Sequence, residues 1–144
     1  MIDTREKAGE LYCGNFNCAQ AVLCAFNPHT GLSDEHALKL AASFGGGMGN
    51  LKEVCGALTG AFMVGGLLKG FTVATGDNKR AHNLVVQAMA DKFKEKFGSI
   101  HCRDLLQRNI DDGSHATEAK PCLKYVLYAV DISNELLESC RKDV

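Results

Sequence analysis

One uncharged segment limits the folds open to this chain. The 15 residues VCGALTGAFMVGGLL, from Val54 to Leu68, lie between Glu53 and Lys69 and include four glycines. A span across a bilayer needs ~20 apolar residues, so we expect a buried core helix. Glycine inside a helix costs about 1 kcal/mol relative to alanine, so this segment predicts that other helices approach it closely.

The rest of the chain repeats its apolar residues with the 3.6-residue period of a helix, and no segment alternates as a strand does. The only prolines, Pro28 and Pro121, lie at plausible helix boundaries, and 144 residues make one ordinary domain. We therefore predict an all-α fold, a compact bundle of six or seven helices in a single domain over residues 1–144.

Capping residues predict where these helices begin and end. We expect Thr4, Asn17, Ser33, Asp77 and Ser99 to open helices, and Pro121 to be the first residue of the last helix. The expected segments are 4–13, 17–26, 33–43, 54–69, 77–97, 99–107 and a central last helix from 121 through at least 130. In segment 77–97 the core-facing residues are expected to be Ala81, Leu84, Ala88, Phe93 and Phe97, and DDGSHATEAK at 111–120 is expected to be a loop.

The charge pattern excludes several classes of protein. The formal net charge is -1 and no run of basic residues occurs, so nucleic acid is not an expected partner. The N-terminus MIDTREK is charged from Asp3 onward, which is unlike a secretory signal. We expect a cytoplasmic protein that does not span a membrane.

Seven cysteines are many for a chain of this length, and their number is odd. Without an export signal, a disulfide scaffold is disfavoured. Four of them fall in the first turn of four different expected helices: Cys18, Cys55, Cys102 and Cys122. Cys13 and Cys140 fall near helix C-termini and Cys24 inside a helix, so these three are expected to be packing residues only.

A helix N-terminus favours thiolate over thiol, because it presents unpaired backbone N–H groups and a partial positive charge. Thiolate is both the nucleophile and the metal ligand. The position of the four cysteines therefore predicts reactive or ligating thiols. The plainer alternative is that each is a small buried hydrophobic residue.

The pattern of Cys18, CGALTG at 55–60, Cys102 and Cys122 resembles the C_GCAxxG_C_C family of redox-active proteins. Flanking segments that match are CAQAVL at 18–23, FGGGMG at 44–49 and FGSIHC at 97–102, and the resemblance covers about residues 11–132. It implies that the four cysteines are the hallmark redox thiols, and it gives no role to the other three. Members are often encoded near transporter genes, which implies a transporter-associated partner.

Two chemistries suit four converging thiols. They can ligate zinc or an iron–sulfur cluster, for which four cysteines are a common ligand set. Alternatively, pairs of them can cycle between dithiol and disulfide with no cofactor. No CxxC is present, so tertiary packing must assemble either site, and the sequence does not choose the pairs. We favour a bound metal or cluster, because four thiolates repel one another without a cation among them.

Three other interpretations of the sequence have less support. FGGGMG lacks the preceding strand and the Gly-Lys-Ser/Thr ending of a phosphate-binding loop, so we expect a connector or an amide-lined loop beside the thiols. His101 adjoins Cys102, but adjacent helical residues point about 100° apart, which disfavours it as base or ligand. The contrasting class is a helical binding or scaffold protein, such as a transporter accessory, with purely structural cysteines. The sequence leaves the redox partner open and allows a homo-oligomer.

Overall fold

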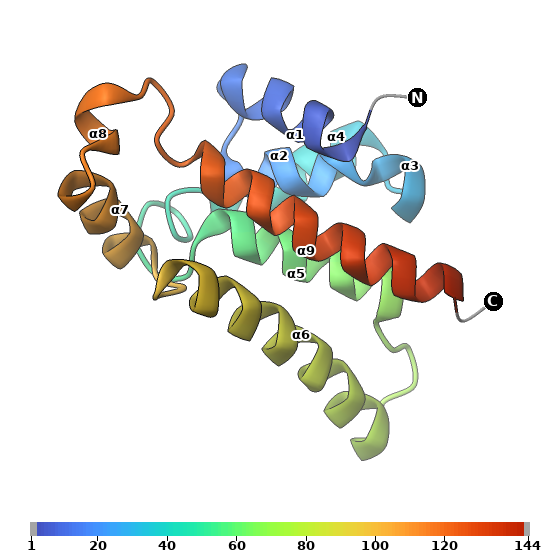
Figure 1. Ribbon diagram of the computed structural model, residues 1–144. Helices are drawn as coiled ribbons and strands as arrows, with labels where there is room; N and C mark the ends of the chain where they lie inside the picture. Colours follow the sequence, from blue (N-terminus) through green and yellow to red (C-terminus); the bar gives the residue numbers. More distant parts are fainter. Residues whose placement is uncertain (1–2, 143–144) are drawn as a thin grey trace.

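The computed structural model describes residues 3–142 as a bundle of helices around one core (Figure 1). The elements are α1 (Thr4–Cys13), α2 (Cys18–Ala25), α3 (Asn27–Thr30), α4 (Asp34–Ala41), the 3-10 turn η1 (Ala42–Phe44), α5 (Gly56–Lys69), α6 (Gly76–Phe97), α7 (Cys102–Asp111), α8 (Ser114–Thr117) and α9 (Leu123–Lys142). The all-α prediction is confirmed, since this part of the chain contains no strand. Seven helices have at least seven residues, and α3 and α8 are single turns that the sequence analysis did not anticipate.

Helix α5 is the glycine-rich segment, and it lies in the middle of the bundle. It packs against α2, α6 and α9, and its apolar residues Ala57, Leu58, Ala61 and Val64 are fully buried. At Gly60, a Cβ atom would lie 2.9 Å from the backbone oxygen of Ala19 in α2. The predicted close approach of other helices to this segment is confirmed.

Helix α9 is the second central element, as predicted. It packs on α5 and α1, and Tyr125, Val126, Ala129 and Val130 are buried along it. Its start differs slightly from the prediction, because the helix begins at Leu123 and Pro121 lies in the preceding turn.

Local capping explains several helix starts. Asn17 forms a reciprocal capping box with Gln20 at the start of α2, and the side chain of Ser33 accepts the backbone N–H of His36 at the start of α4. Gly14, Gly70 and Gly98 are the C-caps of α1, α5 and α6. These positions agree with the sequence analysis.

Three predicted N-caps are wrong. The caps are Asp3 for α1, Thr75 for α6 and His101 for α7, in place of Thr4, Asp77 and Ser99. In the last case the Ser99 hydroxyl accepts the backbone N–H of His101 and donates to Asp104. Ser99 therefore orders the turn before the helix, and the N-cap of α7 lies two residues later than expected.

The predicted core face of α6 is only partly correct. Phe93 and Phe97 are buried, but Ala81 and Ala88 are exposed and 65% of Leu84 is exposed. The main reason is that these residues lie on different sides of the helix, since a step of 100° per residue puts Leu84 and Ala88 about 140–180° around the axis from Phe93. The N-terminal half of α6 also extends away from α5 and α9 (Figure 1). Apolar periodicity identified the helix but not its core-facing side, which is formed by Met89, Phe93 and Phe97.

None of the helices within residues 3–142 is long and apolar enough to cross a membrane. This agrees with the expectation that the chain does not span one.

Candidate functional site

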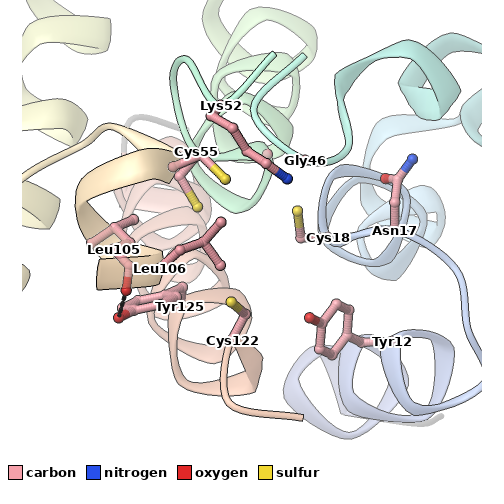
Figure 2. A pocket seen from close by; sticks show the side chains of 12 residues that line it. Tyr12, Asn17, Cys18, Gly46, Lys52, Cys55, Leu105, Leu106, Cys122 and Tyr125 are labelled. Carbon is pink, nitrogen blue, oxygen red and sulfur yellow. Dashed lines mark hydrogen bonds between the residues drawn. The ribbon is translucent and has the colours of Figure 1, made fainter. Parts of the chain in front are cut away.

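Four cysteines from four separate helix starts line one cavity of about 240 Å³ (Figure 2). Cys18 is the first residue of α2, Cys55 is the N-cap of α5, and Cys102 is the first residue of α7. Cys122 directly precedes α9, and its carbonyl accepts the backbone N–H of Val126. The other lining residues are Tyr12, Asn17, Gly46, Lys52, Gly56, Leu105, Leu106 and Tyr125.

The absence of a side chain at Gly56 lets the start of α5 approach the start of α2. A Cβ atom at this position would lie 2.5 Å from Cys18 Sγ and 2.8 Å from the backbone oxygen of Phe44. Both distances are shorter than van der Waals contact. The first glycine of the CGALTG segment is therefore required for two of the four thiols to share a cavity.

A short antiparallel bridge brings Cys55 and Cys102 together. Val54 pairs with His101, the N–H of Cys55 donates to the Ile100 carbonyl at 2.8 Å, and the N–H of Cys102 donates to the Glu53 carbonyl at 2.5 Å. Successive side chains in such a bridge point to opposite faces, so Cys55 and Cys102 share one face and His101 lies on the other. His101 accordingly does not line the cavity.

The glycine-rich loop after η1 covers the same cavity. Gly47 has a φ of +71°, and a Cβ atom there would lie 2.7 Å from Cys102 Cβ, so only glycine fits without a shift. Gly46 lines the cavity, and its backbone N–H lowers the pKa of Cys18. This is the amide-lined loop beside the thiols that the sequence analysis allowed.

Burial raises the pKa of all four site thiols, which corrects the sequence prediction. For Cys55 burial is the largest cause and the charge of Cys18 adds to it, while the backbone N–H groups of Ala57 and Leu58 lower the pKa by less. Burial is also the largest cause for Cys18, Cys102 and Cys122. The backbone N–H groups at the helix N-termini lower the pKa of the thiols, as expected, but desolvation of the thiolate raises it by more.

Side chains that the sequence analysis missed distinguish the four sulfurs from one another. Lys52 extends over the cavity (Figure 2) and lowers the pKa of Cys102. Asn109 Nδ2 donates to Cys122 Sγ at 3.4 Å. Burial raises the pKa of Tyr12, and the nearby thiols, Cys122 first, raise it further. No local sequence signal marks these residues, because each lies far along the chain from the cysteine it contacts.

How close the cysteine sulfurs lie to one another decides whether the cavity can hold a single metal ion. The seven cysteines, all within residues 3–142, are free thiols. In the same range, no three Cys, His, Asp or Glu side chains are grouped closely enough to hold one metal ion. The four thiols therefore surround a space and are not gathered at a single point.

The remaining three cysteines lie outside the cavity. Cys24 is buried inside α2, Cys13 is exposed at the end of α1, and Cys140 is partly exposed near the end of α9. The four cysteines that the sequence places at helix starts line the cavity, and the other three do not.

A family model described as "Putative redox-active protein (C_GCAxxG_C_C)" matches residues 16–136, which is most of the chain. No curated protein and no solved structure matches.

Proposed function

Given that the chain belongs to the C_GCAxxG_C_C family, we propose that Cys18, Cys55, Cys102 and Cys122 form its redox site and hold an iron–sulfur cluster. The observation that carries the proposal is that these four thiols, and none of the other three, line one cavity. The proposed location is the cytoplasm, where reducing conditions keep such thiols unpaired.

The raised pKa values favour a bound cationic group over a bare dithiol. Free thiol chemistry needs thiolate, and burial keeps these four sulfurs protonated at neutral pH. A cation in the cavity would offset both the desolvation of the thiolates and their mutual repulsion, and its binding would release the four protons.

A cluster suits the cavity better than a single zinc ion. Tetrahedral zinc needs each sulfur at about 2.3 Å, and no three candidate ligands of the described chain lie close enough for that. Zinc also has no redox chemistry, whereas an iron–sulfur cluster supplies one-electron transfer. An iron–sulfur cluster is bulkier than one ion, so it would suit four thiols that surround a space, and the four cysteines that line the cavity would hold it.

In this proposal the chain's own groups have distinct roles. The four sulfurs are the ligands, and the apolar walls formed by Leu105 and Leu106 exclude water. The backbone N–H groups of Gly46 and Ala57, which already act on Cys18, would donate to sulfur and raise the reduction potential.

The test is a measurement of iron and acid-labile sulfide in protein purified without oxygen, for the wild type and for single cysteine-to-serine variants. We expect bound iron and sulfide in the wild type and their loss in Cys18→Ser, Cys55→Ser, Cys102→Ser and Cys122→Ser. Cys13→Ser is the matched control, because Cys13 is exposed and outside the cavity. Metal-free wild-type protein, or iron content that all four variants retain, would reject the cluster.

A second candidate is thiol–disulfide exchange by Cys55 and Cys102, which the Val54–His101 bridge favours. Diagonal neighbours across such a bridge have Cα atoms about 7–8 Å apart, so a small backbone shift would allow a disulfide. The dithiol would reduce a disulfide of the partner to two thiols and become a disulfide itself, so that two electrons and two protons pass to the partner.

The candidates give different results in metal-free protein. Exchange predicts a reversible Cys55–Cys102 disulfide in a peptide map after equilibration with oxidised and reduced glutathione, with Cys18 and Cys122 still free. A scaffold protein with structural cysteines, including an accessory of a transporter, predicts neither iron nor this disulfide. It also predicts that a variant with all four cysteines replaced still binds its partner.

A further inference from the structure

Asn109 is a fully buried polar residue at the edge of the cysteine cavity. It belongs to α7, and none of its surface is exposed. Its Nδ2 atom donates to Cys122 Sγ at 3.4 Å, and its Oδ1 atom accepts the Tyr125 hydroxyl at 2.7 Å. Both ends of the side-chain amide are thus satisfied, one by a residue of the proposed redox site and the other by a residue of α9.

Tyr125 determines which end of the amide faces the sulfur. When its O–H donates to Oδ1, the N–H group must point to Cys122. The hydroxyl also lies 3.2 Å from the Leu105 carbonyl, a contact drawn as a dashed line in Figure 2. The Tyr125 ring is held in place by Phe97, whose ring lies edge-on with its centroid at 4.7 Å.

The backbone at Asn109 is also fixed. The Ser114 hydroxyl donates to the Asn109 carbonyl at 3.3 Å, and Lys124 donates to that hydroxyl at 3.0 Å. Lys124 and Tyr125 follow Cys122 closely in the chain. The segment that carries the Cys122 sulfur therefore also carries the side chains that hold Asn109, the donor to that sulfur. A side chain locked in this way is suited to hold a reacting atom in one position.

We propose that Asn109, oriented by Tyr125, is a positioning residue of the thiol site. Its side-chain N–H group holds Cys122 Sγ toward the cavity and stabilises this sulfur when it carries negative charge, as a free thiolate or as a cluster ligand. Among the four site thiols, Cys122 is the one that receives a side-chain amide, whereas backbone N–H groups act on Cys18 and Cys55. The expected effect of Asn109 on the reduction potential rests on the proposed function. Its expected effect on the reactivity of the free Cys122 thiol does not.

The test uses Asn109→Leu and Tyr125→Phe in the full chain, with Tyr128→Phe as the matched control. Leucine fills a similar volume without a donor, and the Tyr125 hydroxyl keeps the Leu105 carbonyl as acceptor. Tyr128 loses the same oxygen within the same aromatic cluster, beside Phe93 and Phe97, but does not line the cavity. Circular dichroism and thermal melts establish which variants are folded.

The first readout is an anaerobic redox titration of the metal-loaded protein. We expect Asn109→Leu to lower the reduction potential, because hydrogen bonds to ligand sulfur raise it, and to weaken iron binding by about 10–100-fold. Tyr125→Phe should lower the potential by a smaller amount, because the amide keeps its donor but loses its orientation. Tyr128→Phe should leave the potential unchanged.

The second readout needs no metal. In reduced, metal-free protein at pH 8, mass spectrometry follows the alkylation of each cysteine by iodoacetamide. Loss of a hydrogen bond to a charged group lowers the thiolate population about tenfold. Part of this is offset by the greater nucleophilicity of a more basic sulfur, so Cys122 should react about three- to fourfold more slowly in Asn109→Leu, with Cys18 unchanged.

The two readouts separate failure of the inference from failure of the cluster proposal. Metal-free wild-type protein with a slower Cys122 in Asn109→Leu would reject the cluster and support the role of Asn109. An unchanged potential and an unchanged Cys122 rate would overturn the role of Asn109 whether or not iron is bound. If Asn109→Leu does not fold, Tyr125→Phe decides, and values equal to those of Tyr128→Phe would overturn the inference.

Discussion

Replacing Gly56 by alanine adds one methyl group where the starts of α2 and α5 meet. The new Cβ would lie 2.5 Å from Cys18 Sγ, which is about 0.9 Å short of the 3.4 Å at which ordinary contact begins. It would also lie 2.8 Å from the Phe44 carbonyl oxygen, which belongs to the backbone and cannot rotate away. The change therefore requires that the start of α5 moves away from the Phe44 carbonyl, and that α2 or the Cys18 thiol moves as well.

The free energy of unfolding should fall by about 1–2 kcal/mol. Overpacking a well-packed core costs about 1–3 kcal/mol, and the better helix propensity of alanine returns at most about 1 kcal/mol. Gly66→Ala is the matched control in the same helix, since a Cβ there meets nothing within 4 Å. We expect that variant to gain about 0.5–1 kcal/mol, because it has the propensity gain without the clash.

Urea unfolding of both variants measures the difference. The protein should be reduced and metal-free, so that ligand binding does not add to the stability. Gly56→Ala should also retain less iron than the wild type if the proposed cluster is correct, whereas Gly66→Ala should retain as much. A Gly56→Ala protein as stable as Gly66→Ala would show that the two helix starts are not in close contact, and the account of how the thiols converge would be wrong.

Two further predictions follow from burial. In reduced, metal-free protein, the free energy of unfolding should fall as pH rises above about 8.5, because burial raises the pKa of the four site thiols and the folded state keeps protons that the unfolded chain loses. Urea titrations at pH 7.5 and 9.5 measure this, and a flat profile would contradict the burial of these thiols. In α6, Phe93→Ala should cost about 3–5 kcal/mol and Leu84→Ala less than about 0.5 kcal/mol, since Phe93 is 0% exposed and Leu84 is 65% exposed. Thermal melts of the two variants check this, and equal losses would mean that the N-terminal half of α6 is covered in solution.

Local interactions explain why much of the fold was predictable from the sequence. A capping box such as that of Asn17 and Gln20 involves residues three apart, and a helix-ending glycine such as Gly98 acts within one turn. Such signals identified the long helices and put four cysteines at helix starts. They failed where a nearby residue offers similar chemistry, as when Thr75 became the cap of α6 in place of Asp77.

The sequence by itself determined the helical class, the central α5 and the division of the cysteines into four and three, because periodicity and capping depend on neighbouring residues. Only the tertiary structure decided that the four thiols share a cavity and that Asn109 bonds to Cys122 across 13 residues of chain. It also decided their protonation, since the field of a helix end is local but desolvation depends on everything packed around the sulfur. For Cys55, that surrounding protein outweighs the helix on which the residue sits.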